Sequence, residues 1–170
     1  MILPAEVQTE RLLLRQWREE DVEPLAEIYA QPEYREFMGA WDAPSQIARF
    51  QRQWREVGFS HWAVKELASR LLIGRIGLMR HFDWPLADAP VEVGWTLHRD
   101  WWGRGLATEG GRAARECWRE HLPEDDQLLS IALPANARSR AVMERLGLTY
   151  RGTADWHGFE HVWYAVDRAP

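Results

Sequence analysis

Two short segments of this chain combine residue types that suit the binding of a phosphorylated ligand. Residues 101–111 read WWGRGLATEGG, and residues 136–139 read NARS. Glycines allow a bulky phosphate to approach the backbone closely. The first turn of a helix adds N–H groups without intrahelical partners, at the positive end of the helix dipole. A strand, a glycine-bearing turn and a helix start together form an anion-binding site, so the first segment predicts a phosphorylated cofactor.

The elements around these segments place them close together. A strand-like run over residues 91–97 precedes the first segment, and a helix-like run over residues 108–121 follows it. A strand over residues 128–133 leads into the second segment, which opens a helix over residues 137–146 capped by Gly147. This pattern predicts parallel strands joined by a right-handed crossover. Both segments then lie at the C-terminal ends of neighbouring strands, where open α/β sheets bind ligands.

The rest of the chain alternates between further strands and helices. The other strands are expected at residues 11–17, 61–66, 71–80, 148–156 and 160–167, the other helices at 21–30 and 45–57, and a loop at 82–90. Pro32 is expected to end the first helix, and residues 33–41 show no clear pattern. The order of elements predicts a single α/β domain over residues 1–170, with a central sheet and helices on its faces.

The composition is that of an ordinary globular protein, with 46% hydrophobic and 28% charged residues. The net charge of -5 argues against a general nucleic-acid-binding protein, for which a basic excess is typical. No stretch approaches the about 18 apolar residues of a membrane span, and the N-terminus lacks a signal-peptide pattern. The single cysteine, Cys117, fits a helical packing position and a reducing compartment. We therefore expect a cytoplasmic protein that binds neither membranes nor nucleic acid.

Two other motifs fit this sequence less well. In the dinucleotide fingerprint G-x-G-x-x-G, Gly103 and Gly105 match, but the third glycine falls on Thr108. Residues 157–161, HGFEH, match the zinc-peptidase pattern H-x-x-E-H, which requires a helix. Gly158 breaks any such helix, and the residues that follow are typical of a strand, so no metal site is expected.

The chain resembles the GNAT (GCN5-related N-acetyltransferase) superfamily, in particular its branch of ribosomal-protein alanine and serine N-acetyltransferases (RimJ/RimL type). The resemblance runs nearly from end to end and rests on several spaced motifs in the same order. These are TERLLLR at 9–15, WREED at 17–21, VEVGW at 91–95, WGRGLATE at 102–109, NARS at 136–139 and RLGL at 145–148. The resemblance implies an α/β GNAT fold with helices on both faces. Its central sheet is mixed, mostly antiparallel and seven-stranded, with a splayed parallel strand pair.

The resemblance further implies acetyl-CoA as cosubstrate and no metal. The backbone amides of residues 103–108 are expected to hold the CoA pyrophosphate, and the splayed edge of the strand at 91–97 to hold the pantetheine arm. Gly105 and Ala107 fit fixed positions of the family pattern Q/R-x-x-G-x-G/A, in which Trp102 replaces the Gln or Arg. The residues expected to contact acetyl-CoA are Trp95, Thr96, Leu97, Gly103, Arg104, Gly105, Leu106, Ala107, Thr108, Asn136 and Ser139.

The chemistry of the family is the attack of an amine on a thioester, which needs a neutral amine, a stabilised oxyanion and a proton for the leaving thiolate. A strand N–H near residues 94–96 is expected to donate to the oxyanion. Glu92 is the expected base, directly or through a water, and a salt-bridged strand carboxylate is the alternative. The tyrosine acid of many relatives corresponds to Met143, which cannot donate a proton. Ser139 is the expected replacement; the alternative is a serine bonded to its own helix backbone.

The sequence thus predicts an acetyl-CoA-dependent N-acetyltransferase that acts on a primary amine by direct attack in a ternary complex. A non-catalytic acyl-CoA-binding module is the alternative, which Met143 favours. The acceptor is a small-molecule amine or a protein N-terminus, and the protein is a monomer or a homodimer. We expect the acceptor groove between the first two helices, the loop at 82–90 and the final hairpin. Trp41, Trp84 and Trp156 are candidate wall residues.

Overall fold

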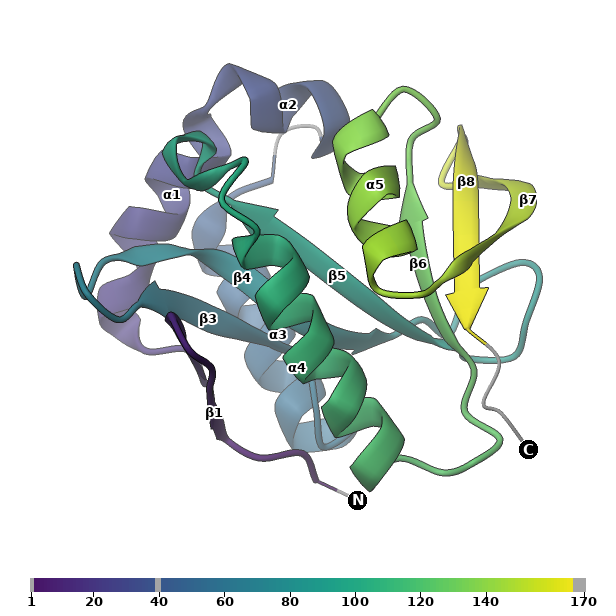
Figure 1. Ribbon diagram of the computed structural model, residues 1–170, viewed down its shortest axis with the longest axis horizontal. Helices are drawn as coiled ribbons and strands as arrows, with labels where there is room; N and C mark the ends of the chain where they lie inside the picture. Colours follow the sequence, from purple (N-terminus) through teal and green to yellow (C-terminus); the bar gives the residue numbers. More distant parts are fainter. Residues whose placement is uncertain (1, 39–40, 167–170) are drawn as a thin grey trace.

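The computed structural model describes residues 2–38 and 41–166, and a mixed eight-stranded sheet runs through this part of the chain (Figure 1). The strands are β1 (Glu6–Gln8), β2 (Leu12–Arg15), β3 (His61–Glu66), β4 (Leu72–Arg80), β5 (Val91–Leu97), β6 (Leu128–Ala132), β7 (Thr149–Trp156) and β8 (Phe159–Val166). Their order across the sheet is β1-β2-β3-β4-β5-β6-β8-β7. Neighbouring strands are antiparallel except β5 and β6, whose parallel pairing confirms the predicted strand–helix–strand unit.

The sheet has one strand more than the seven that the sequence predicts. The additional strand is β1, which pairs with β2 at the edge of the sheet in the register Val7 opposite Leu14. Hydrogen bonds from Gln16 N to Ala5 O and within the turn at Thr9 complete this hairpin. A three-residue strand carries too few positions to show the alternation from which strands are predicted. The central prediction of a mixed sheet with a splayed pair is unaffected by this edge strand.

Helices cover both faces of the sheet. They are α1 (Val22–Ala30), α2 (Pro32–Met38), α3 (Ala43–Glu56), α4 (Leu106–His121) and α5 (Ala137–Arg145), with short 3-10 helices at Glu19–Asp21 and Arg99–Trp101. α4 and α5 lie on one face, and α1 and α3 lie on the other (Figure 1). Each face has an apolar core: Ile76 and Leu146 pack beneath α4 on one face, and Leu25 of α1 and Phe50 of α3 belong to the core on the other. Within the described residues, no helix has the length and apolarity that a membrane span requires.

The helix boundaries differ from the sequence-based expectation by one or two residues at several ends, and two of the differences affect the cavity. Pro32 begins α2 instead of only ending the preceding helix, because proline is well tolerated in a first helical turn, where its missing N–H has no intrahelical acceptor. Helix α4 begins at Leu106, two residues earlier than predicted. Gly105 precedes it at φ 77°, and its carbonyl accepts the first helical hydrogen bond from Glu109 N (2.9 Å). The glycine turn therefore runs directly into the helix.

Strands β5 and β6 diverge toward their C-terminal ends. Their parallel pairing covers only the first two residues of each strand. Just beyond, the buried Ser130 hydroxyl of β6 donates to the Val93 carbonyl of β5 over 2.8 Å. A side chain thus bridges the two strands as they part, and beyond this bridge the edge of β5 faces an opening. This geometry confirms the splayed parallel pair that the sequence predicts.

Candidate active site

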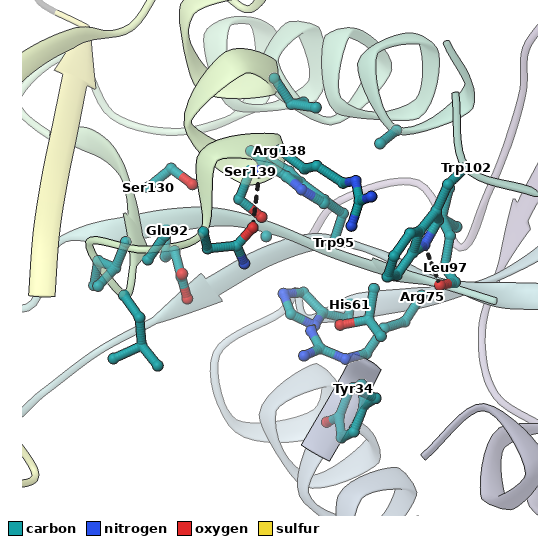
Figure 2. Close-up of a pocket in the computed structure, with 18 of the residues that line it drawn as sticks. Tyr34, His61, Arg75, Glu92, Trp95, Leu97, Trp102, Ser130, Arg138 and Ser139 are labelled. Carbon is teal, nitrogen blue, oxygen red and sulfur yellow. Dashed lines mark hydrogen bonds between the residues drawn. The ribbon is translucent and has the colours of Figure 1, made fainter. Parts of the chain in front are cut away.

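A cavity of about 1790 Å³ lies where β5 and β6 diverge. Sites for a single small ligand usually measure about 300–1,000 Å³, so this cavity has room for two ligands. Residues from both faces of the sheet line it: Arg138 and Ser139 lie on one side, and His61 and Arg75 on the other (Figure 2). We call the lining from α5 and residues 101–109 the α5 half of the cavity. The lining from α2, α3, β3 and β4, together with His81 and the side chain of Glu92 on β5, is the α3 half.

The glycine turn forms the floor of the α5 half. Gly103 (φ 73°) and Gly105 (φ 77°) both adopt left-handed backbone conformations, which glycine tolerates and most residues do not. A Cβ on Gly103 would meet no atom within 4 Å, so the turn is open to a ligand. Trp102 Nε1 donates to Leu97 O over 2.7 Å and fixes the turn to the end of β5. The turn therefore presents the first-turn N–H groups of α4 at an accessible, anchored position.

The cavity collects nearly all of the residues that the sequence predicts as ligand contacts. Those that line it are Glu92, Trp95, Thr96, Leu97, Gly103, Gly105, Leu106, Ala107, Thr108, Asn136 and Ser139. Arg104 does not line it. The Arg104 guanidinium lies 4.8 Å from the centre of the Trp101 ring, and this cation–π contact holds the side chain outside the cavity.

Glu109, in the first turn of α4, connects the glycine turn to the β1–β2 hairpin. Its carboxylate accepts hydrogen bonds from Thr9 Oγ1 (2.6 Å), Arg11 N (2.8 Å) and Arg11 Nε (2.7 Å). Burial alone would raise the pKa of Glu109, but the hydrogen bonds from Thr9 and Arg11 lower this pKa below its ordinary value. The carboxylate is thus ionised and compensated by Arg11, so it stabilises the turn without opposing an anion bound there.

Asn136 and Ser139 meet at the start of α5. Asn136 Oδ1 accepts a hydrogen bond from Ser139 N over 3.1 Å, which caps the helix and is the dashed line beside Ser139 in Figure 2. The cap uses the amide oxygen, so the Nδ2 group is the donor that Asn136 can offer to a ligand. The Ser139 hydroxyl forms no hydrogen bond with any described residue. The alternative in which this hydroxyl bonds its own helix backbone is therefore not observed.

The backbone of Trp95 faces the opening between β5 and β6. Alternate residues of a strand direct their N–H and C=O groups to the same side. Val91 N bonds to Gln127 O, and Val93 O accepts from Ser130, so these two residues face β6. Trp95, next in this series, directs its N–H the same way, at a level where β6 has moved aside. This N–H lies within the stretch in which the sequence predicts an oxyanion donor.

Glu92 lies in the α3 half of the cavity and is held by a histidine. His81 Nε2 lies 2.6 Å from Glu92 Oε2. His81 is buried, and its ring packs edge-on against Trp156 with 4.9 Å between the ring centres. The sequence leaves open whether Glu92 is a catalytic base or a paired strand carboxylate. The structure shows a carboxylate that is paired with His81 and also lines the cavity.

The α3 half also contains a buried guanidinium. Arg75 on β4 is 4% exposed, and its Nη1 donates to Nδ1 of His61 on β3. A guanidinium only donates, so the proton of the neutral His61 ring is on Nε2. Burial lowers the pKa of His61 well below its ordinary value, and the charges of Arg75 and Arg49 lower it further. The Nε2 atom makes no hydrogen bond with the described residues and faces Gly94, where an added Cβ would lie 3.0 Å away.

The walls of the α3 half differ in part from the predicted acceptor groove. Trp41 and Trp156 line the cavity, whereas Trp84 does not, because it is buried with its ring centre 5.4 Å from that of Trp156. Helix α3 lines the cavity as predicted, but α1 does not, because its apolar face packs into the core. Helix α2 takes its place and contributes Tyr34.

Sequence reasoning missed four polar residues of the α3 half, Arg49, His61, Arg75 and His81. One signal was present: Arg75 is the only charged residue inside the otherwise apolar strand β4 before its last position. Charged residues are rarely buried unless they are paired, so such a position points to a partner or a ligand.

The hairpin that carries the H-x-x-E-H sequence lacks the helix that the zinc-peptidase pattern requires. His157 has a positive φ of 52° in the β7–β8 turn, so the two histidines do not share a helix face. In the part of the chain that the structure describes, no group of three or more His, Cys, Asp or Glu side chains is placed to hold a metal ion.

Comparison with known proteins decides the family. Residues 11–149 match the family model of the acetyltransferase (GNAT) domain. The chain belongs to the GNAT acetyltransferases. The match confirms the resemblance to this superfamily that the sequence motifs indicate. The protein therefore belongs to a family of N-acetyltransferases.

Solved structures of acetyltransferases superpose over almost the whole chain. An acetyltransferase from Agrobacterium tumefaciens str. C58 is 28% identical, with a TM-score of 0.83 over 99% of this chain and 96% of that one. The ribosomal-protein-S5-alanine acetyltransferase from Vibrio fischeri is 13% identical, with a TM-score of 0.75, covering 96% and 97%. RimL, a ribosomal L7/L12 alpha-N-protein acetyltransferase solved in complex with coenzyme A, is 15% identical, with a TM-score of 0.71, covering 98% of both chains. The last two show a shared fold.

Proposed function

We propose that this GNAT protein transfers an acetyl group from acetyl-CoA to a primary amine, by direct attack of the amine in a ternary complex. One observation carries the proposal. At the divergence of β5 and β6, a single cavity brings together an open glycine turn on one side and the Glu92 carboxylate on the other. A donor held in the α5 half and an acceptor held in the α3 half would meet beside Trp95.

The residues present fit acetyl-CoA. The first-turn N–H groups of α4, behind Gly103 and Gly105, suit a pyrophosphate. The open edge of β5 at Trp95 suits the amide groups of a pantetheine arm, and the Nδ2 group of Asn136 is directed by its capping bond. Two GNAT relatives were solved with this ligand class: RimL with coenzyme A, and the microcin C7 self-immunity acetyltransferase MccE with acetyl-CoA and AMP.

The roles of this chain's own residues follow from their positions. Acetyl-CoA supplies an activated acyl group as a thioester. The Trp95 N–H points into the opening and can donate to the carbonyl oxygen as negative charge develops there. Glu92, held by His81, removes the proton of the amine directly or through a water. The Ser139 hydroxyl, which forms no hydrogen bond with a described residue, lies in the cavity wall at the start of α5. We assign it the protonation of the leaving sulfur, while the hydroxyl takes up a proton from water.

A second candidate is a non-catalytic acyl-CoA-binding module. It is favoured by Met143, which stands where many relatives have the tyrosine acid and which is completely buried in the core. Release of CoA from acetyl-CoA that depends on an added amine distinguishes the two, because only an enzyme produces it.

Thermal unfolding with acetyl-CoA and, separately, with NAD tests the ligand. At 100 times its dissociation constant, a ligand adds about 2.7 kcal/mol to the stability of the folded state, which raises the Tm of a chain of this size by roughly 5–10 °C. We expect such a shift with acetyl-CoA alone. A folded protein whose Tm does not respond to acetyl-CoA would exclude the proposed reaction.

A further inference from the structure

The α3 half of the cavity contains a buried guanidinium, that of Arg75, which forms no ion pair with a described residue. Arg75 is 4% exposed, its Nη1 is bonded to the neutral His61, and its Nε has no hydrogen-bond partner in the described residues. No described carboxylate lies within ion-pair distance of the Arg75 guanidinium. An uncompensated buried charge is costly, so such a group in a cavity wall points to an anion that is supplied from outside.

Three carboxylates of the cavity wall already have other partners. These pairs are Glu33 with Arg99 (3.1 Å), Glu92 with His81 (2.6 Å) and Asp83 with His157 (3.0 Å). None of the three forms an ion pair with the Arg75 guanidinium.

Three further donors face the same space as Arg75. Arg49 on α3 is half-buried and lines the cavity, and it forms no ion pair with a described residue. The Nε2–H of His61 has no acceptor, as shown above. Burial raises the pKa of the Tyr34 hydroxyl, which is therefore protonated and able to donate. Two guanidiniums without an ion pair in the described residues and two neutral donors form a site suited to an oxyanion.

This oxyanion site lies beside the proposed catalytic carboxylate. A Cβ placed on Gly94 would lie 3.0 Å from His61 Nε2 and 3.7 Å from the Glu92 carboxyl carbon, so the two side chains are neighbours across this glycine. His61 in turn contacts Arg75. An amine that faces Glu92 would thus carry its anionic group a few bonds away.

We infer that the acceptor is a small primary amine that carries a compact oxyanion, a carboxylate or a phosphate, and that Arg75 and Arg49 bind this oxyanion. The inference rests on the proposed acetyltransferase function and names its substrate class. A protein N-terminus presents a neutral amide carbonyl at the corresponding distance, which would leave the Arg75 charge without compensation. The overall charge of -5 does not contradict this, because the charge relevant for the acceptor is that of the cavity wall.

The experiment compares acceptors that differ only in the anion. Phenylalanine is compared with phenylalanine amide and phenethylamine, and O-phosphoethanolamine with ethanolamine, by amine-dependent release of CoA. We expect kcat/KM for an anionic acceptor to exceed that of its neutral analogue by about 100-fold. A higher kcat/KM for phenylalanine than for its neutral analogues identifies a carboxylate site. A higher kcat/KM for O-phosphoethanolamine than for ethanolamine identifies a phosphate site. Equal kcat/KM values within both series would overturn the inference.

Three variants test which arginine is responsible for the preference for anionic acceptors. We expect Arg75→Met to remove most of the preference and Arg49→Met to reduce it about 10-fold, through KM more than kcat. Arg52→Met is the matched control, because Arg52 is an exposed residue of α3 outside the cavity. We expect this variant to prefer anionic acceptors over neutral ones as strongly as the wild type does. If Arg75→Met does not fold, Arg49→Met alone decides, and a preference in this variant as large as that of the wild type overturns the inference.

Failure of the inference is distinguishable from failure of the proposed function. If the inference is wrong, neutral amines are acetylated as well as anionic ones, and acetyl-CoA still raises the Tm. If the proposed function is wrong, no amine of either series releases CoA.

Discussion

His81 Nε2 lies 2.6 Å from Glu92 Oε2, so a buried histidine at the end of β4 fixes the position of a carboxylate on the adjacent strand β5. The pair lies near the point where β5 and β6 diverge, and the His81 ring packs against Trp156. This arrangement holds the carboxylate in one orientation toward the cavity and gives it a neighbour that can share a proton. The proposed base is thus held at a defined position in the cavity wall.

The first prediction concerns this carboxylate. Glu92→Gln keeps the size of the side chain but removes its basicity, so we expect kcat to fall by about 10²- to 10⁴-fold. The dissociation constant of acetyl-CoA, measured by calorimetry, should not change, because Glu92 lies in the other half of the cavity. The kcat loss should be smaller for amines of low pKa, which are neutral without a base. An unchanged kcat would show that Glu92 is only a structural partner of His81.

A second prediction concerns the proposed acid. Ser139→Ala removes a hydroxyl that forms no hydrogen bond with described residues, so the stability of the protein should hardly change. We expect kcat to fall by about 10²-fold, because the leaving thiolate loses its proton donor, with little change in acetyl-CoA affinity. Single-turnover kinetics with and without the substitution measure this effect directly. Equal rates would assign protonation of the sulfur to water.

A third prediction separates two roles of Asn136. Asn136→Ala removes both the cap of α5 and the Nδ2 donor, so it should cost about 1 kcal/mol of stability and also weaken acetyl-CoA binding. Asn136→Ser retains a capping oxygen without the amide donor. Urea denaturation should therefore find Asn136→Ser close to the wild type, while calorimetry finds its acetyl-CoA affinity reduced. If Asn136→Ser binds acetyl-CoA normally, the residue is a helix cap and not a ligand contact.

The contiguous motifs made one half of the site predictable from sequence. The glycine turn, the β5 edge and the start of α5 each occupy a few successive residues, and local geometry dictates what they can bind. The seven longer strands were predictable for the same reason, because their apolar patterns are local. β1 escaped prediction because it is short, and α2 because Pro32 marks both the end of one helix and the start of the next.

The cluster of His61, Arg75 and Glu92 in the α3 half was not predictable, because these residues meet only through the register of the sheet. His61 stands opposite Gly77, and Ala63 stands opposite Arg75, so the histidine and the arginine share one face of neighbouring strands. Glu92 joins them only because Gly94 has no side chain to separate them. The sequence contains each of these residues, but their proximity is a long-range property that residue spacing does not reveal.

The fourth prediction is a pH dependence of stability that originates from His61. Burial lowers the pKa of His61 in the folded protein well below the ordinary value of 6.5. Below about pH 6.5 the unfolded chain therefore binds a proton that the native ring does not, so stability falls as the pH is lowered, by at most about 1.4 kcal/mol per pH unit. Above pH 6.5 both states are neutral, and this contribution is constant.

His61→Gln tests this prediction, because glutamine can still accept from Arg75 but does not titrate. Urea denaturation between pH 5 and pH 8 should show the variant losing less stability than the wild type on acidification, whatever its stability at pH 8. His161→Gln serves as the control, because this half-exposed histidine of β8 should leave the slope unchanged. Parallel curves for the wild type and His61→Gln would mean that His61 binds its proton equally in the native and unfolded states. The ring would then be open to solvent, and its Nε2–H would not be a fixed donor in the oxyanion site.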